Sequence, residues 1–212
     1  MTRSTPSRPP ARSPAAPSLP TLLVLLALTA SAGCSTATEP APRPSAVRNT
    51  APAPAASASG TPTDAAWVQL MTPMNERAVA LLALAADRAT EPRVRAFATR
   101  LRGDQEAELG RLRPLLARMG LPRTDVHTGH AMPGMVTESD LAAAKAADGA
   151  AFDRLFLTRF RDHLRHSAQV SRSEMTAGAR ADAKRLAAAL VTAREAALTE
   201  LEALPGATRA LA

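Results

Sequence analysis

Two of the four histidines and two of the seven methionines lie within one short segment of the sequence, from His127 to Met135. Imidazole nitrogen and thioether sulfur are ligands that soft ions such as Cu(I) prefer, whereas hard cations favour oxygen. Gly129, Pro133 and Gly134 would let this segment fold around an ion. His127, His130, Met132 and Met135 are therefore candidate metal ligands. The alternative interpretation is that the segment is only a polar connection between helices.

A second candidate site combines Met71 and Met74 with His163. All three residues lie on apolar stripes with helical spacing, so they are expected to face the interior of a helical bundle. The alternative is that the methionines fill irregular space in the core, and that a semi-buried histidine is hydrogen-bonded without binding a metal. Both interpretations remain open from the sequence alone.

No arrangement of residues in the sequence indicates catalysis. A di-iron centre in a helical bundle needs paired Glu-x-x-His motifs, and no glutamate here is followed by histidine three residues later. Ser167 and His166 are adjacent, and adjacent side chains on a helix point apart. There is no glycine-rich phosphate loop and no cysteine-based zinc motif. We therefore expect a binding protein rather than an enzyme, with no organic cofactor.

The elements that would position these residues are four helices in two hairpins, spanning residues 64–120 and 149–206. Asp64 is expected to cap the first helix, and Thr90 the second. Pro73 is expected to kink or restart the first helix. Residues 121–136 are expected to form a loop, followed by a short helix capped by Thr137.

A single offset of 89 residues, without gaps, aligns the two hairpins. It places Trp67 against Phe156, and Met74 against His163. Because each hairpin alone would expose an apolar face, the two are expected to dock into an all-α four-helix bundle over residues 64–212. All five aromatic residues fall on the expected core stripes, namely Trp67, Phe97, Phe152, Phe156 and Phe160.

The first 63 residues are predicted to be a signal peptide and a tether. A positively charged leader precedes an apolar run from Leu22 to Leu28, which is too short to span a bilayer. Residues 1–33 are thus predicted to be removed, with Cys34 as the site of lipid attachment and residues 34–63 as a disordered spacer rich in proline, alanine and serine. Ordinary cleavage after the small residues near Ala32 is the alternative, which would give a secreted protein instead of a membrane lipoprotein.

The positive charge of the chain does not indicate nucleic-acid binding. The formal net charge is +7, but five arginines and one glutamate precede Asp64, so only +3 belongs to the predicted bundle. The charges there alternate in sign, as in the stretch that includes Arg102, Glu106 and Glu108, which is typical of a solvated helix surface. The expected partners are a soft metal ion and the membrane, and no protein partner is indicated.

The sequence resembles the bacterial family called domain of unknown function 305. The resemblance rests on Asp64–Trp67 and the stretch up to Leu112, on the loop Gly129–Met135, and on Gly149–Leu157. It implies an exported, duplicated, ferritin-like four-helix bundle, some members of which are associated with copper. The family repeat has a methionine followed three residues later by a His-His pair. Here the pair is replaced by Met74-Asn75 in the first repeat and by His163-Leu164 in the second, so the chain resembles a divergent member with most repeat histidines missing.

Two functions follow from these observations. The first is an exported, lipid-anchored bundle that binds a copper-type ion through the segment from His127 to Met135, which we call the His/Met loop. His163, Met71 and Met74 would help to bind the ion. The alternative is a degenerate member of the family that has lost its metal and acts as a structural or interaction module in the cell envelope.

Overall fold

The computed structural model describes residues 60–212, which form six α-helices. Their bounds are α1 Pro62–Arg88, α2 Pro92–Arg118, α3 Glu138–Ala146, α4 Gly149–Ala177, α5 Ala181–Glu202 and α6 Ala207–Leu211. The predicted signal peptide, the lipid attachment site at Cys34 and nearly all of the predicted tether lie outside the described residues. None of the described helices is long and apolar enough to cross a membrane.

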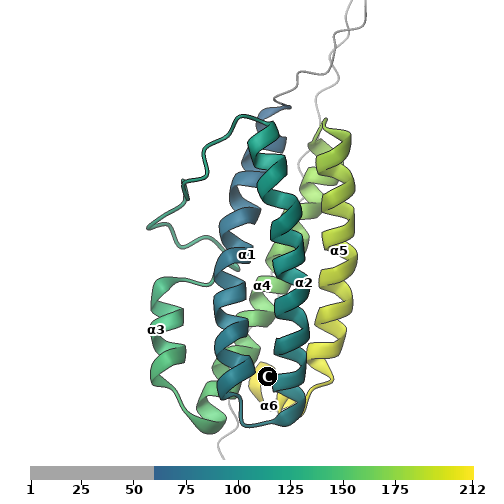
Figure 1. Cartoon of the computed structure of the whole chain (residues 1–212). Helices are drawn as coiled ribbons and strands as arrows, with labels where there is room; N and C mark the ends of the chain where they lie inside the picture. Colours follow the sequence, from purple (N-terminus) through teal and green to yellow (C-terminus); the bar gives the residue numbers. More distant parts are fainter. Residues whose placement is uncertain (1–59) are drawn as a thin grey trace, which may run out of the picture. The chain divides into compact units, whose positions relative to one another are not determined.

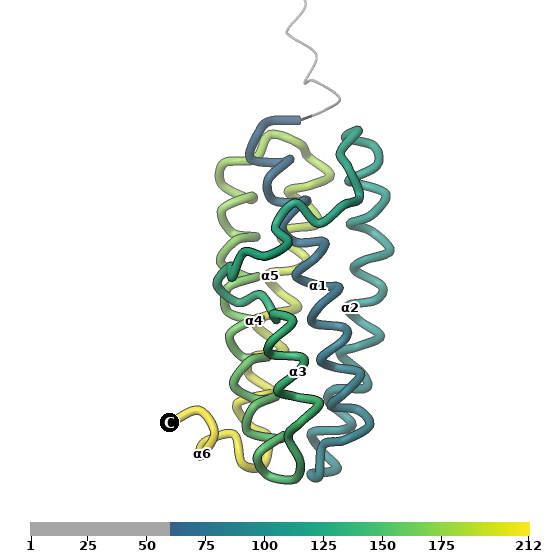
Figure 2. The backbone as a smooth tube through the Cα atoms, turned by 90° about the vertical axis from the view of Figure 1, so that its left-hand side faces the viewer, coloured from purple at the N-terminus to yellow at the C-terminus, as the bar shows by residue number. Residues whose placement is uncertain are grey.

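The four long helices form an antiparallel bundle, which confirms the predicted fold (Figure 1). α1 packs against α2, α4 packs against α5, and the two hairpins dock mainly through α1 and α4. The short helix α3 lies outside the bundle against α1 and α4, and α6 packs on α4 at the end where the chain finishes (Figure 2). The bundle is therefore built from two repeated helical hairpins.

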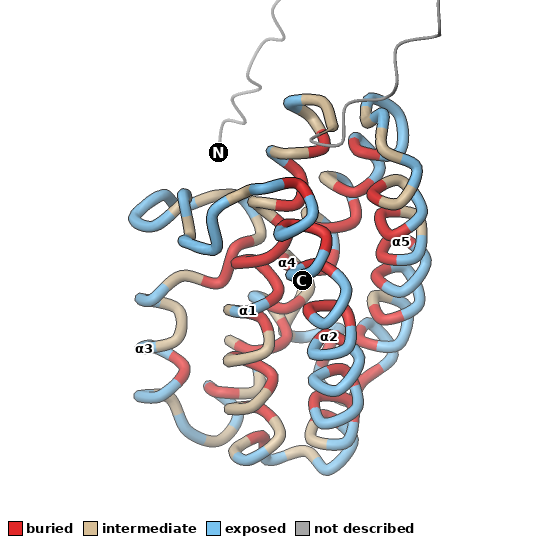
Figure 3. Tube along the Cα trace, turned by 45° about the horizontal axis from the view of Figure 1, so that its top comes forward, coloured by how far each residue is buried: buried red, intermediate tan, exposed pale blue. Residues whose placement is uncertain are grey.

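Buried residues recur along each of the long helices (Figure 3), and the apolar ones form two clusters, one toward each end of the bundle. The first contains the stacked rings of Phe156 and Phe160, whose centroids are 5.5 Å apart. The second contains Trp67 and most of the methionines. All five aromatic residues are buried, as the sequence predicted. Between the two clusters lies a layer of buried polar side chains, which positions the candidate site described below.

The start of α1 differs from the prediction. Thr61, not Asp64, is the N-cap, and Asp64 is the third residue of the helix, where it completes a capping box with Thr61. Proline is favoured at the first position of a helix, so α1 begins at Pro62 and the predicted tether ends before residue 63. The prediction failed because Asp64 and Thr61 are both good capping residues, and only the proline between them decides which one caps.

Asp64 also ties the start of α1 to the turn between α4 and α5. Its carboxylate accepts hydrogen bonds from the backbone N–H groups of Ala179 (3.1 Å) and Arg180 (2.9 Å), as well as from Thr61. The carboxyl of Glu174 lies against it, only 1% exposed, and neither oxygen of Glu174 receives a hydrogen bond from another group in the described part of the chain. This end of the bundle thus buries two acidic side chains in contact.

Three further local features narrow the prediction or differ from it. Pro73 does not restart α1, because the helix continues through it with Met71 and Met74 buried on either side. Thr90 does not cap α2: the N-cap is Glu91, and the Thr90 hydroxyl donates instead to Asp153 of the other hairpin. The helix α6 was not predicted.

Candidate metal site

The His/Met loop runs along α1 and α4 on its way from α2 to α3 (Figure 2). Two successive turns shape it, in which the N–H of His130 donates to the carbonyl of His127 and the N–H of Met135 to that of Met132. Arg77 of α1 fixes its beginning, since the guanidinium lies 3.2 Å from the carboxylate of Asp125. The loop is therefore held against the bundle and is not a free surface connection.

Gly134 brings the loop into direct contact with α4. Its φ is +72°, a conformation that favours glycine, and an added Cβ would lie 2.4 Å from Cβ of His166 and 2.9 Å from the carbonyl oxygen of Asp162. Only a residue without a side chain permits this approach. The loop thus rests on the turn of α4 that carries His163, which lies between Asp162 and His166.

The methionines of the two predicted sites meet in one apolar cluster. Met71 and Met74 of α1 are fully buried, Met135 of the loop is 7% exposed, and Met132 packs at the edge of the same cluster. Met119 at the end of α2 completes the group, which we call the methionine cluster. The loop and the methionines of the second candidate site, which were separate candidates in the sequence, therefore lie in one region of the fold.

His163 is fully buried at the centre of the bundle. Its Nε2 lies 3.4 Å from the side-chain nitrogen of Gln105, its ring stacks on Phe160, and its Nδ1 has no well-formed hydrogen bond among the described residues. Burial, with the positive charge of Arg194, lowers the pKa of His163 to about 3, although the carbonyl of Gly134 acts in the opposite direction. The imidazole is therefore neutral near pH 7, which is the state in which histidine binds metals.

The two loop histidines, and His166 of α4, have different surroundings. His127 is half-buried and its Nε2 is shielded from solvent without a hydrogen-bond partner, whereas His130 is exposed. His166 is half-buried and its Nδ1 lies 2.9 Å from the carbonyl of Asp162. Only His163 is set within the core of the bundle, and the loop touches its helix through Gly134.

A buried ion pair next to His163 was missed by sequence reasoning. Arg194 of α5, 2% exposed, donates to both carboxylate oxygens of Glu108 on α2 at 2.9 and 2.6 Å. The guanidinium also donates to the side chains of Asn75 (3.0 Å) and Ser167 (3.1 Å), and Asn75 donates to Glu108. One hydrogen-bonded network thus joins all four long helices.

A sequence signal for this ion pair existed. Glu108 falls between Leu101 and Leu112 on the core stripe of α2, and Arg194 falls between Leu190 and Leu201 on that of α5. The interpretation of Glu108 as part of a solvated surface was wrong, because the alternating charges around it hid its place on the apolar stripe. A charge on each of two core stripes is itself an indication of a buried pair.

The donor atoms around the methionine cluster suit a soft ion better than a hard one. The buried thioethers of the cluster, and the neutral imidazole of His163 on the turn of α4 that the loop contacts, are ligands of the type that Cu(I) prefers. In the part of the chain that the structure describes, no group of three or more histidine, cysteine, aspartate or glutamate side chains is arranged to hold a metal ion. Any ion bound here would therefore depend on methionine sulfur.

The architecture and this cluster define a duplicated four-helix bundle with a methionine-rich interior and a histidine at its polar layer. The chain belongs to the family "Domain of unknown function (DUF305)", whose model matches residues 31–116 and 64–205.

Two solved structures are similar to the chain in fold. A DUF305 protein of Streptomyces coelicolor that is considered to be secreted is 22% identical, with a TM-score of 0.59 over 66% of this chain and 90% of that one. A DUF305 fragment of Deinococcus radiodurans is 22% identical, with a TM-score of 0.60 over 68% of this chain and 95% of that one. Among curated proteins, none matches the chain.

Proposed function

We propose that this protein is an extracytoplasmic, lipid-anchored bundle that binds a soft metal ion of the Cu(I) type and is not an enzyme. The ligands are the thioethers of Met71, Met74 and Met135 together with the imidazole of His163. The predicted leader and the secreted relative support the location. Lipid attachment at Cys34 rests on the sequence pattern.

The observation that carries the proposal is the meeting of the His/Met loop with the interior of the bundle. Met135 belongs to the same apolar cluster as Met71 and Met74, and the neighbouring Gly134 lies against the turn of α4 that bears His163. An apolar core needs no histidine in this position, and burying one whose Nδ1 makes no well-formed hydrogen bond carries a free-energy cost. A bound ion would give that nitrogen a partner.

The remaining loop residues have a supporting role in this proposal. Met132 lies at the edge of the methionine cluster, and His127 and His130 precede it on the loop. The imidazole of His130 is exposed and therefore accessible to an ion in solvent. Cu(I) supplies no catalytic chemistry here, since the chain only holds the ion.

We expect the wild-type protein to compete with a chromophoric chelator for Cu(I) under anaerobic conditions. Changing Met71, Met74 and Met135 together to leucine keeps the volume of the core and removes the sulfur ligands. The affinity for Cu(I) should therefore fall at least about tenfold, since changing only the groups around a metal ligand can already cause a loss of that size. Met175→Leu is the matched control, because Met175 is 38% exposed and lies outside the cluster. Equal affinities of the triple variant and wild type would contradict the proposal.

The second candidate function, a structural or interaction module without metal, is favoured by the ion pair of Arg194 and Glu108. That pair links the helices through protein groups alone. A wild-type protein that fails to compete for Cu(I) would support this alternative.

The lipid anchor is tested separately. Cys34→Ala should move the protein from the membrane fraction to the soluble fraction of cells that express the full chain, because the acyl chains provide the attachment. Detection of the protein by immunoblot in both fractions measures the effect. An unchanged membrane fraction would count against lipidation at Cys34.

A further inference from the structure

A groove of about 420 Å³ lies between the last turns of α2 and the first turns of α5. Arg111 and Arg118 line it from α2, and Arg185 lines it from α5. The apolar side chains of Leu115 and Leu186 are buried at its base. The groove therefore combines cationic walls with an apolar floor.

The positive charge of this groove is not neutralised within the described residues. The one acidic side chain in its lining is Asp182, whose carboxylate is already shared by Arg118 (3.3 Å) and Arg180 (2.8 Å). Arg111 and Arg185 are exposed and contact no acidic group in residues 60–212. Two guanidinium groups thus remain available to an anion, and a guanidinium matches a phosphate with two parallel hydrogen bonds.

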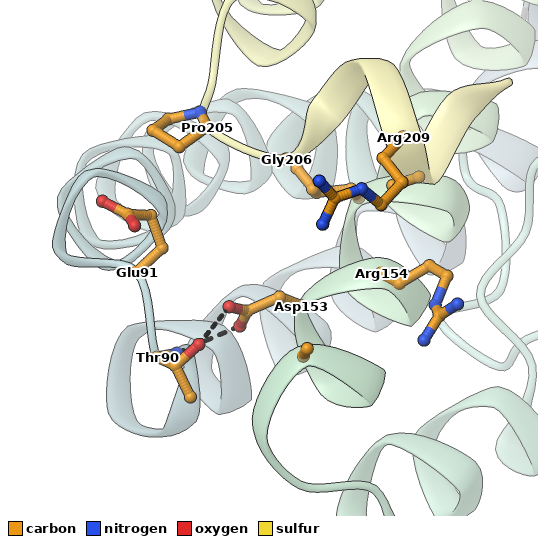
Figure 4. A pocket seen from close by; sticks show the side chains of 10 residues that line it. Thr90, Glu91, Asp153, Arg154, Pro205, Gly206 and Arg209 are labelled. Atoms are coloured by element: carbon orange, nitrogen blue, oxygen red, sulfur yellow. Dashed lines mark hydrogen bonds between the residues drawn. The ribbon is translucent and has the colours of Figure 1, made fainter.

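The opposite end of the bundle provides a contrast. A pocket of about 270 Å³ there also contains two arginines, Arg154 and Arg209, but Glu91 and Asp153 line it with them (Figure 4). Two acidic and two basic groups balance in this pocket. The excess positive charge therefore distinguishes the groove between α2 and α5 from its counterpart.

The last turns of α2 and the first turns of α5, which line the groove, lie at the end of the bundle where α1 begins (Figures 1 and 2). Gly60, the first described residue, directly precedes α1, and Cys34 precedes Gly60 by 26 residues. Whatever its conformation, that length of chain spans at most about 90 Å. If Cys34 carries a lipid, this end of the bundle is held within that distance of the bilayer.

We propose that the groove between α2 and α5 binds the headgroups of anionic phospholipids in the membrane to which the chain is attached. The proposal rests on the lipid anchor of the proposed function. The arginines contact the headgroup phosphates, and the apolar floor receives the glycerol and the first methylenes of the lipid. Two weak attachments on one chain strengthen each other, because the tether keeps the local concentration of headgroups high. The binding lays the basic end on the membrane and leaves the end with α6 exposed.

The test uses the exported form expected from the sequence, residues 34–212, with Cys34→Ser so that no lipid contributes. This protein should float with vesicles of phosphatidylglycerol and phosphatidylcholine but not with phosphatidylcholine alone, and high salt should release it. The variant with Arg111→Glu, Arg118→Glu and Arg185→Glu should lose at least about tenfold in vesicle binding. Because the unlipidated protein is used, failure of the anchor at Cys34 would not change this result.

A matched control carries the same change of charge at the other end of the bundle, with Arg93→Glu, Arg154→Glu and Arg209→Glu. It should retain most of the binding. The double variant Arg111→Gln with Arg185→Gln breaks no ion pair and should also weaken vesicle binding. It keeps the test valid even if the triple variant folds poorly. Circular dichroism checks the folding of each variant. Any of three results would overturn the proposal: an equal loss of vesicle binding in both triple variants, no binding of the wild-type groove to anionic vesicles, or binding to polyglutamate in place of vesicles.

Discussion

Replacing Arg194 with methionine is expected to lower the free energy of unfolding by about 4 kcal/mol. The change leaves the carboxylate of Glu108 buried, with Asn75 as its one remaining side-chain donor among residues 60–212. A buried charge that loses its partner costs far more than the pair contributed, because the carboxylate has already given up its hydration. Urea denaturation followed by circular dichroism measures the effect.

The double variant Arg194→Met with Glu108→Leu should recover much of this loss, since it removes both charges and fills the space with apolar atoms. Arg172→Met is the matched control. Arg172 pairs with Glu195 across α4 and α5, but both side chains are about half exposed, so its loss should cost less than about 1 kcal/mol. The buried network would be unimportant for stability if Arg194→Met and Arg172→Met had the same effect.

The second large effect is a fall in stability as the pH rises from 6.5 to 8. Burial and the adjacent Asp64 carboxylate raise the pKa of Glu174 from 4.5 to about 8, although Lys184 acts in the opposite direction. The folded protein therefore holds a proton that the unfolded chain releases. The stabilisation this gives is complete below pH 4.5 and is lost as the pH rises through 8.

Other groups act in different pH ranges. Burial alone would raise the pKa of Asp64, but hydrogen bonds from Thr61, Arg180 and Glu174 hold it below its usual range, so its contribution is lost only in strong acid. The pKa of His163 is lowered from 6.5 to about 3, so its contribution is complete above pH 6.5 and declines as the pH falls below that value. Of these three groups, only Glu174 changes the stability between pH 6.5 and 8.

Over this interval the free energy of unfolding should fall by about 2 kcal/mol, since one proton corresponds to about 1.4 kcal/mol per pH unit. Glu174→Gln should abolish the dependence, because the amide can donate to Asp64 at every pH. Glu195→Gln, a change at an exposed glutamate, should leave the slope intact. Urea denaturation at three pH values measures this pH dependence of the free energy of unfolding. A wild-type protein that is equally stable at pH 6.5 and 8 would show that Glu174 is not protonated in the folded state.

The architecture was predictable from the sequence because it depends on periodicity. The apolar stripes, the offset of 89 residues and the glycines and prolines at the helix ends all act locally, and they gave the four-helix bundle and its two hairpins. The start of α1 was less certain, since Thr61 and Asp64 compete for the same role and differ by less than one helical turn.

The candidate site was predictable only in part. The residue types of the loop suggested metal chemistry, but the contact of Gly134 with α4 joins residues 28 and 32 positions apart in the sequence, which no local pattern encodes. The partnership of Arg194 with Glu108 is equally non-local. Polar residues on an apolar stripe mark where such contacts occur, but they do not identify the partner.

The polar layer also determines which hairpins can pair. The 89-residue offset that relates the two halves places Gln105 against Arg194 and Met74 against His163. The two hairpins therefore have similar folds but different side chains in the polar layer. Two copies of the first hairpin docked on each other would bury two Glu108 carboxylates without a guanidinium. Two copies of the second would bury two Arg194 side chains without a carboxylate. Only unlike halves satisfy both charges, so the network disfavours the pairing of two like hairpins and sets which half docks on which.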